Sequence, residues 1–321
     1  MDLLKSVFSL ASPGGAKARL SVFIFHRVLP LPDPLFPDEI HAGNFDEICG
    51  WIAGWCNVLP LDQAMASMKS GTLPARAACV TFDDGYADNF HVARPILEHH
   101  RLPATFFVAT GFLDGGRMWN DTVIESIRLT DLPALALGDL LGPEFAGVPV
   151  ASTVDKSAAI GRVIGRAKYM PPAERAAFVD EMAERARARL PGDLMMTSDE
   201  VRAMRKAGMQ IGAHTVSHPI LATLDASAAR SEIAQSKRAL EGILGERVGL
   251  FAYPNGKPGV DYSEESVAIV RELGFDAAFS TRWAASRADT DVFQIPRFTP
   301  WDRTRFRFGA RMLGNLRVQD S

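Results

Sequence analysis

Residues 80–89 read VTFDDGYADN. They continue an apolar run at 77–82 that is typical of a buried strand and that ends on two adjacent carboxylates. Successive strand side chains point to opposite faces, so Asp83 and Asp84 can serve one site only if the backbone leaves strand geometry there. Gly85 can take the positive φ that such a sharp exit needs. On its own, the stretch also fits a strand end with a solvated acidic turn.

A second stretch, far along the chain, points to a metal centre. Residues 214–218 read HTVSH and follow another apolar run at 209–213. Imidazoles four positions apart lie on one face of a helical turn, as a divalent metal ion requires. Two imidazoles and one carboxylate would leave open positions for water and for a substrate oxygen. The two stretches together therefore favour a metal centre at the ends of two strands.

Both stretches resemble those of the polysaccharide deacetylases, carbohydrate esterase family four, and the resemblance extends in order over residues 26–297. It implies that Asp83 is the general base and that Asp84, His214 and His218 hold the metal. The implied function is a metal-dependent hydrolase that removes N-acetyl groups from N-acetylhexosamine units of a polysaccharide or glycan precursor, its base activating a metal-bound water. One divalent ion is expected, zinc first, although cobalt, nickel or iron would bind the same ligands.

Two motifs of that family are altered in this chain. Most members carry an Arg that orients the base and a late His that protonates the leaving group. The corresponding segments here read AYPN at 252–255 and IPR at 295–297, so both residues are missing. An imidazole titrates in the range that a general acid needs. We therefore expect His26, at the end of the first predicted strand, to be the general acid, and Arg297 to orient Asp83.

The chain alternates strands and helices, which favours a parallel sheet. Polar groups stand at the carboxyl ends of four predicted strands, where the loops of α/β barrels converge. We expect a distorted (β/α) barrel with seven or eight mostly parallel strands over residues 21–321, preceded by an amphipathic segment at 1–20. A helical insertion is expected at about 119–190, with helices over 155–168 and 172–190. The predicted strands are 21–25, 57–61, 77–82, 104–109, 209–213, 249–253, 277–280 and 291–296.

Composition narrows the class of protein. Charge is nearly balanced, with 35 Lys and Arg against 38 Asp and Glu, so nothing marks a nucleic-acid partner. An odd number of cysteines, 3, is no disulfide framework and fits a reducing compartment. No stretch approaches the roughly 20 apolar residues of a membrane span. Residues 1–12 fit an amphipathic helix that packs on the barrel or lies on a membrane surface. Without a secretory signal, we expect a cytoplasmic protein, or one peripheral to the inner membrane.

Three residues are candidates for substrate contacts: Tyr253 and Asn255 at a strand end, and Trp119, whose ring could stack on a sugar. The FHR segment at 25–27 resembles that of exopolysaccharide-modifying deacetylases, which suggests extracellular or capsular polysaccharide synthesis. Two other functions stay open. An impaired, metal-containing glycan-binding module would explain the missing Arg and His, but it has no chemical need for Asp83. A deacylase of a nucleotide-linked or lipid-linked sugar would use the same residues, and only substrate profiling separates it.

Overall fold

The computed structural model describes residues 3–300 and 302–318. The chain divides into two units, which we describe separately. The first, called the barrel unit, comprises Met1–Leu31, Ile40–Leu113 and Met196–Ser321. The second, called the insertion unit, comprises Pro32–Glu39 and Asp114–Met195.

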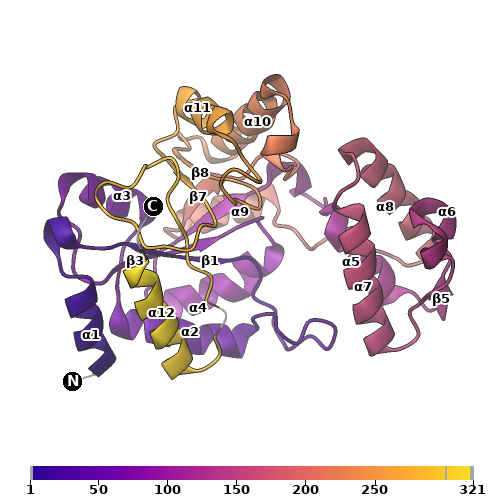
Figure 1. The fold of residues 1–321 in the computed structure, drawn as a ribbon, viewed down its shortest axis with the longest axis horizontal. Coiled ribbons are helices and arrows are strands. Elements are labelled where there is room, and N and C mark those ends of the chain that lie inside the picture. Colours follow the sequence, from indigo (N-terminus) through magenta and orange to yellow (C-terminus); the bar gives the residue numbers. More distant parts are fainter. Residues whose placement is uncertain (1–2, 301, 319–321) are drawn as a thin grey trace. The chain divides into compact units, whose positions relative to one another are not determined.

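A parallel sheet forms the centre of the barrel unit (Figure 1). Neighbouring strands follow one another in chain order, namely β1 (Ser21–Phe25), β3 (Ala77–Phe82), β4 (Ala104–Val108), β7 (Gln210–Ala213), β8 (Leu250–Ala252) and β9 (Ala277–Phe279). Each of these pairs is parallel. The short β2 (Asn57–Val58) pairs with the start of β3. Almost every strand residue is buried, as expected for a parallel sheet covered on both faces.

The stretch that follows β9 closes the gap between β9 and β1. Isolated parallel bridges join Ile295 to β9 and Phe298 to β1. The sheet therefore curls into a distorted (β/α) barrel, which confirms the predicted fold class. The regular strand predicted at 291–296 is wrong. Pro296 has no N–H to donate to a ladder, and the stretch forms isolated bridges instead.

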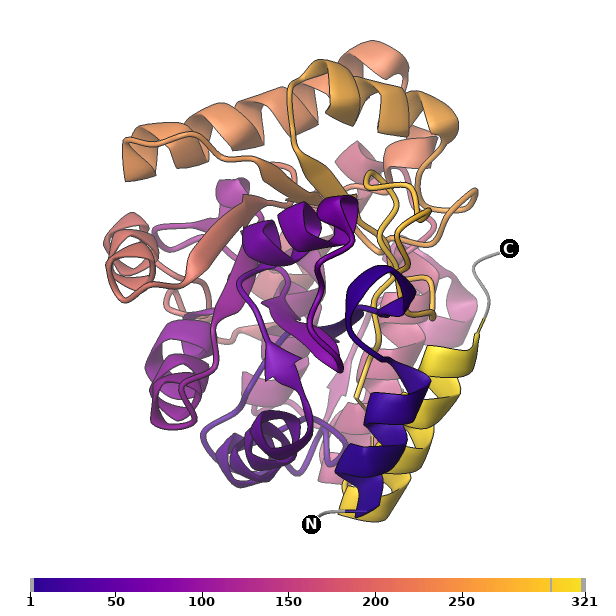
Figure 2. The ribbon, with the colours of Figure 1, turned by 90° about the vertical axis from the view of Figure 1, so that its left-hand side faces the viewer.

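Helices surround this sheet. They are α2 (Ala42–Trp55), α3 (Leu61–Ser70), the π-helical η2 (Asn89–Ala93), α4 (Arg94–His99), η3 (Thr110–Phe112), α9 (Ser198–Lys206), η5 (Leu221–Thr223), α10 (Ala226–Leu244) and α11 (Glu264–Glu272). Thr197 and Ser263 begin α9 and α11 with reciprocal capping bonds. Gly71 ends α3 in the left-handed conformation, with a φ of 68°. Figure 2 shows α10 and α11 side by side over one part of the sheet.

The first described helix packs on the barrel. Helix α1 (Leu3–Ala11) lies against α12 (Arg305–Arg317) and α2 (Figure 2). The rings of Phe8 and Trp55 are 5.5 Å apart, and Trp55 is 1% exposed. The amphipathic helix expected in residues 1–12 is thus present in its described part, with Phe8 buried against the barrel and Leu10 exposed. No described helix has the length and apolar character to span a bilayer. Contact with a membrane surface, and the compartment, stay predictions.

The three cysteines are buried and unpaired. Cys49 lies in α2, Cys56 directly follows it, and Cys79 lies inside β3. The prediction that they form no disulfide framework is therefore confirmed.

The insertion unit has its own apolar core. It contains a short antiparallel pair, β5 (Ala134–Leu135) and β6 (Val148–Pro149), and the helices α5 (Trp119–Leu129), α6 (Gly138–Leu141), η4 (Pro143–Phe145), α7 (Thr153–Ala167) and α8 (Pro172–Ala186). Arg128 in α5 binds Asp33 at 2.7 Å, which ties residues 32–39 to this unit. The insertion expected at about 119–190 lies within it, but the small β5–β6 sheet was not predicted.

Candidate active site

The chain turns sharply at the carboxyl end of β3. Asp84 and Gly85 both have positive φ, 77° and 87°, so the backbone leaves strand geometry between the two acids. A Cβ at Gly85 would lie 3.0 Å from Cγ1 of Val108, which restricts this position further. The N–H of Asp83 donates to the carbonyl of Phe25 at 2.9 Å and anchors the turn to β1. The sharp exit predicted from the sequence is confirmed, and both carboxylates are buried.

Arg297 holds Asp83 in a bidentate ion pair. Its Nη1 and Nη2 lie 2.6 and 2.7 Å from the two carboxylate oxygens. Its Nε donates to the carbonyl of Ser280 at 2.9 Å, and the whole side chain is buried. Burial by itself raises the pKa of Asp83, but the opposing charges, Arg297 first, outweigh it and lower the pKa to about 2. Asp83 is therefore a fixed carboxylate at neutral pH.

The two histidines lie on a loop after β7, not on a helical turn. Thr215 and His218 have φ values of 64° and 53°, which a right-handed helix does not allow. The hydroxyl of Thr215 donates to the carbonyl of His214 at 2.5 Å and accepts from the N–H of His218 at 3.1 Å. These local bonds replace the helix. The predicted helical geometry is wrong, yet the two imidazoles lie together, with ring centroids 4.9 Å apart.

Asp84, His214 and His218 converge on one point. Oδ1 of Asp84 lies 3.5 Å from Nε2 of His214 and 3.4 Å from Nε2 of His218. Among the described residues this buried oxygen has no hydrogen-bond partner, which is costly unless a cation offsets its charge. The three ligand atoms lie within 4.8 Å of one another. Two imidazoles and one carboxylate suit zinc-like ions, so these residues fit a divalent cation.

The protonation of His214 also suits a metal ligand. Its Nδ1 lies 2.7 Å from the carbonyl oxygen of Ala252, a bond that only a protonated Nδ1 can donate. The lone pair of Nε2 is then free to bind a cation that Asp84 would share. Burial lowers the pKa of His214 to about 4, so the imidazole is neutral at pH 7. Burial raises the pKa of Asp84, and His26 is the largest of the charges that oppose this rise.

Two residues outside the sequence motifs hold the loop of residues 214–218, which we call the histidine loop. Glu232 in α10 accepts hydrogen bonds from the N–H groups of Val216 and Ser217, each at 2.9 Å, and from the hydroxyl of Ser217 at 2.8 Å. Gly111 donates to the carbonyl of Val216 at 2.8 Å, and a Cβ at Gly111 would lie 2.7 Å from that oxygen. Sequence reasoning missed both residues, because no spacing rule connects them to the histidines.

His26 stands at the carboxyl end of β1, beside the acidic turn. Nδ2 of Asn89 donates to the carbonyl of His26 at 2.8 Å. Asp88 accepts from Nε of Arg27 at 2.8 Å and from the N–H of Val28 at 3.1 Å. The end of the VTFDDGYADN stretch thus holds the loop that carries His26, a role that the sequence did not reveal. The His26 residue is exposed, and its charge acts on both acids of the turn.

Tyr253 points into the core. It is 0% exposed, its ring stacks on Tyr262 with centroids 3.8 Å apart, and its hydroxyl donates to the carbonyl of Phe293 at 3.0 Å. Burial raises the pKa of Tyr253 far above its usual value, so the phenol stays protonated. The end of β8 turns this ring away from solvent, so the side chain of Tyr253 is not placed to contact substrate. A contact through its backbone stays a prediction.

Asn255 and Trp119, the other two candidates for substrate contact, differ in exposure. Asn255 is exposed just beyond β8, with a φ of 56°, and the hydroxyl of Thr281 donates to its carbonyl at 2.7 Å. Trp119 is the first residue of α5, in the insertion unit, and is half-buried. The guanidinium of Arg175 lies 4.8 Å from the centre of its ring, so a cation already covers part of the indole. For both residues, contact with substrate stays a prediction.

Comparison with known proteins identifies the family. The sequence model described as polysaccharide deacetylase matches residues 70–129 and 167–278, more than half of the chain. The chain therefore belongs to the polysaccharide deacetylase family, which confirms the resemblance drawn from the two motifs and implies an acetylated glycan as substrate. Among curated proteins it is similar to YxkH of Bacillus subtilis (strain 168), named as a candidate polysaccharide deacetylase. The two are 18% identical over 282 residues, 87% of this chain and 71% of YxkH.

Two solved structures share the fold. The deacetylase PplD of Streptococcus pyogenes, solved in complex with acetate, is 17% identical, with a TM-score of 0.61 over 94% of this chain and 99% of PplD. IcaB of Ammonifex degensii is 18% identical, with a TM-score of 0.60 over 96% of this chain and 99% of IcaB. At this level of identity the likeness concerns the fold, and it agrees with the barrel described above.

Proposed function

We propose that this polysaccharide deacetylase is a metal-dependent hydrolase that removes N-acetyl groups from N-acetylhexosamine units of a polysaccharide or glycan precursor. The observation that carries the proposal is the convergence of Asp84, His214 and His218 beside the ion pair of Asp83 and Arg297. The buried Oδ1 of Asp84, which accepts no hydrogen bond from the described residues, supports a cation at this point. Zinc matches the ligand types best, and cobalt, nickel or iron would also be accepted.

Asp83 is the residue of this chain that can accept a proton at the site. A divalent ion held by Asp84 and the two histidines would polarise the acetyl carbonyl and lower the pKa of a nearby water molecule. Asp83 is adjacent to Asp84 in the chain, and its Oδ2 lies 3.8 Å from Nε2 of His214. We assign to Asp83 the role of general base that takes a proton from the attacking water. Arg297 is then a positioning residue that keeps Asp83 ionised and in one orientation.

Departure of the amine requires a proton, which we assign to His26. An imidazole can donate a proton near neutral pH. The side chain of His26 is exposed at the end of β1, and its charge interacts with the acids at the end of β3. Most family members use a late His to protonate the leaving group and an Arg to orient the base, and this chain lacks both. We assign these two tasks to His26 and Arg297.

The buried ion pair also favours an enzyme over a module that only binds glycans. Burying a carboxylate and a guanidinium costs free energy that their attraction does not always recover. A binding module would gain nothing from Asp83 and Arg297 in this arrangement, whereas a general base requires a fixed carboxylate. The acetate in the PplD structure supports the acyl group that we propose, because acetate is the product of N-deacetylation.

The experiment combines metal content with acetate release. Wild type, His214→Ala and Asp83→Asn, purified without a histidine tag, are compared by elemental analysis. Acetate release is measured with N-acetylglucosamine oligomers and with nucleotide-linked and lipid-linked N-acetylhexosamines. We expect His214→Ala to lose one metal equivalent and its activity, and Asp83→Asn to keep the metal but lose the activity.

His91→Ala is the matched control, because His91 is an exposed imidazole that pairs with Glu200 at 2.7 Å. It should keep both metal and activity. Metal without acetate release from any of these substrates would favour the glycan-binding module. Metal content unchanged in His214→Ala would reject the ligand assignment, and release from linked monosaccharides alone would move the substrate from polymers to precursors.

A further inference from the structure

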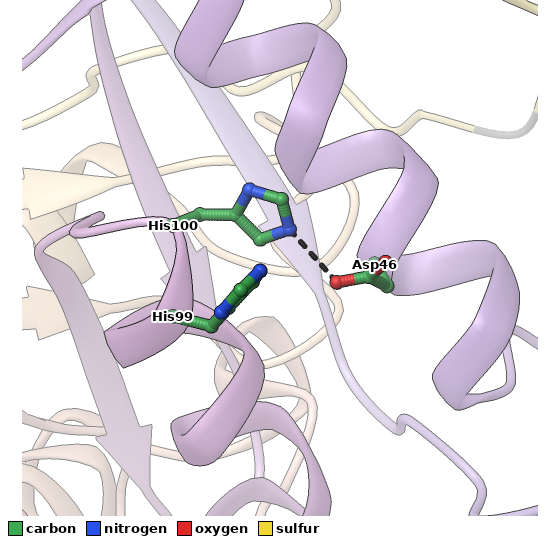
Figure 3. Close-up of side chains that lie close together, drawn as sticks. All are labelled: Asp46, His99 and His100. Carbon is green, nitrogen blue, oxygen red and sulfur yellow. Dashed lines mark hydrogen bonds and ion pairs between the residues drawn. The ribbon is translucent and has the colours of Figure 1, made fainter.

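A second group of metal-ligating side chains lies outside the candidate active site. It consists of Asp46 on α2 and of His99 and His100 at the end of α4, and we call it the outer cluster. One ligand atom from each residue lies within 4.8 Å of the other two. Nε2 of His100 is 2.8 Å from Oδ1 of Asp46. Figure 3 shows both imidazoles facing the Asp46 carboxylate across the gap between the two helices.

The outer cluster is remote from the active site within the barrel unit. His100 stands only four positions before Ala104, the first residue of β4, so it lies near the amino end of that strand. Asp83, Asp84 and the histidine loop lie beyond the carboxyl ends of β3 and β7. A ligand at the outer cluster therefore cannot share donors with the catalytic centre.

One imidazole of the outer cluster is already held in place. The side chain of His100 is only 17% exposed, and a Cβ at Gly50 would lie 3.6 Å from its Cε1. Gly50 is one helical turn beyond Asp46, so His100 rests against the same face of α2 that carries the carboxylate. The ring of His99 stands edge-on to that of His100, with centroids 4.9 Å apart. His99 and Asp46 are exposed, which leaves a path for an ion from solvent.

We propose that the outer cluster is a second metal site, which binds one zinc-like divalent cation through the imidazoles of His99 and His100 and the carboxylate of Asp46. These donor types suit zinc, nickel and copper(II) rather than magnesium or calcium. A tetrahedral ion with ligands at about 2.0–2.2 Å holds its donor atoms roughly 3.4 Å apart. In the outer cluster Nε2 of His100 and Oδ1 of Asp46 are 2.8 Å apart, and every pair of ligand atoms lies within 4.8 Å. Small rotations of the exposed side chains would therefore complete the site.

The role that follows is structural. A cation bound there links α2 to α4, and α2 in turn packs on α1. Because binding to the folded state alone raises its stability, zinc should stabilise the barrel unit through this site. Substituting a metal-ligating residue of the outer cluster should leave the rate of deacetylation unchanged, because none of these residues belongs to the candidate active site.

The test removes the catalytic ligands first. In a tag-free background carrying His214→Ala and His218→Ala, calorimetric titration with zinc chloride should still show one equivalent per chain, and zinc should raise the melting temperature. Adding His99→Ala, or separately Asp46→Asn, should abolish the binding and the rise. Adding His91→Ala should leave both unchanged, because His91 lies outside the cluster, paired with Glu200.

Far-ultraviolet circular dichroism verifies that each variant is folded. Two ligands are substituted independently, so the test can still be read if one of the variants does not fold. No zinc uptake by the background protein would overturn the proposal and leave His100 and Asp46 as an ion pair only. Uptake that persists at the same stoichiometry in both His99→Ala and Asp46→Asn would overturn it as well. Neither result bears on the catalytic site, which is absent from every protein in the test.

Discussion

Arg297 and Asp83 stand 214 positions apart in the chain and form one buried, bidentate ion pair. The guanidinium reaches Asp83 from the stretch that closes the barrel, and on the way it donates to the carbonyl of Ser280 just beyond β9. One side chain thus connects the end of β3, the end of β9 and the closing stretch. The position of the proposed base therefore depends on closure of the barrel.

Replacing Arg297 with Gln leaves the carboxylate of Asp83 buried and unpaired. Removing one partner of a buried ion pair costs about 3–5 kcal/mol, so Arg297→Gln should have a clearly lower free energy of unfolding. The folded protein should keep its metal, while kcat falls by about 10²-fold or more with little change in KM, because the base is no longer fixed. Urea unfolding, elemental analysis and steady-state kinetics check these outcomes.

Two further variants separate charge from geometry. Arg297→Lys restores a positive charge but not the planar fork, so stability should recover more than kcat does. Arg247→Gln is the matched control, since Arg247 makes a bidentate pair with Asp276 on the surface, where ion pairs stabilise little. A wild-type kcat in Arg297→Gln would show that Arg297 does not position the base.

Glu232→Gln tests the support of the histidine loop. Oε2 of the carboxylate accepts from both N–H groups and Oε1 accepts from the Ser217 hydroxyl. An amide in its place lacks the negative charge that strengthens these bonds, and its NH2 group cannot accept from the donor that it then faces. We expect the affinity of the catalytic site for zinc to fall about 10–100-fold, as is typical when an outer partner of a metal ligand is lost. Titration against a competing chelator, in a His99→Ala background that lacks the outer cluster, measures this affinity.

Glu246→Gln provides the comparison for that variant. Glu246 pairs with Arg205 on the exposed surface. Its substitution should leave the zinc affinity unchanged. Equal affinities in Glu232→Gln and Glu246→Gln would mean that the loop keeps its shape without the carboxylate.

The positions of the site's polar side chains could be predicted because they are local in the sequence. Asp83 and Asp84 end one apolar run, and the two histidines follow a second apolar run. The ends of the predicted strands therefore indicate where the polar side chains lie. The loop shape could not be predicted in the same way, because a spacing of four fits both a helical turn and a tight loop. The left-handed conformation of Thr215 and the hydrogen bonds that the loop donates to Glu232 decide between them, and these bonds depend on the distant helix α10.

Tyr253 shows a different limit of sequence reasoning. Its place at the end of an apolar run made a contact with substrate plausible, but in a strand as short as β8 the pattern does not show which face meets the site. The side chain turns inward because Tyr262 and the carbonyl of Phe293 offer a stacking surface and an acceptor. The strand predicted at 291–296 failed for a similar reason. The missing N–H of Pro296 interrupts a strand only where a neighbouring strand would accept its hydrogen bond, and the sequence does not show which strands are neighbours. Such outcomes depend on tertiary packing.

Gly111→Ala should disturb the histidine loop from its other side. An added methyl would lie 2.7 Å from the carbonyl oxygen of Val216 and 3.0 Å from its Cγ1, so the loop between the two histidines must move. Overpacking of this kind costs about 1–3 kcal/mol, and we expect weaker metal binding and lower activity as well. In Gly242→Ala, a Cβ in α10 meets nothing within 4 Å, so this control should gain about 0.4–1 kcal/mol.

Urea unfolding and zinc titration of the two glycine variants give the result. A Gly111→Ala protein as stable and as tightly metallated as wild type would show that the close approach to Val216 places no constraint on the site.

His26→Ala tests the proposed proton donor. We expect kcat for an N-acetylated glycan to fall by about 10²–10⁴-fold, the usual contribution of a general acid, while metal content stays the same. The loss should be much smaller for 4-nitrophenyl acetate, because its leaving group departs without a proton. This contrast between substrates separates a proton donor from a residue that only shapes the site, which would affect both. His91→Ala should match wild type with either substrate, and a His26→Ala rate within a few-fold of wild type on the glycan would assign the proton to another group.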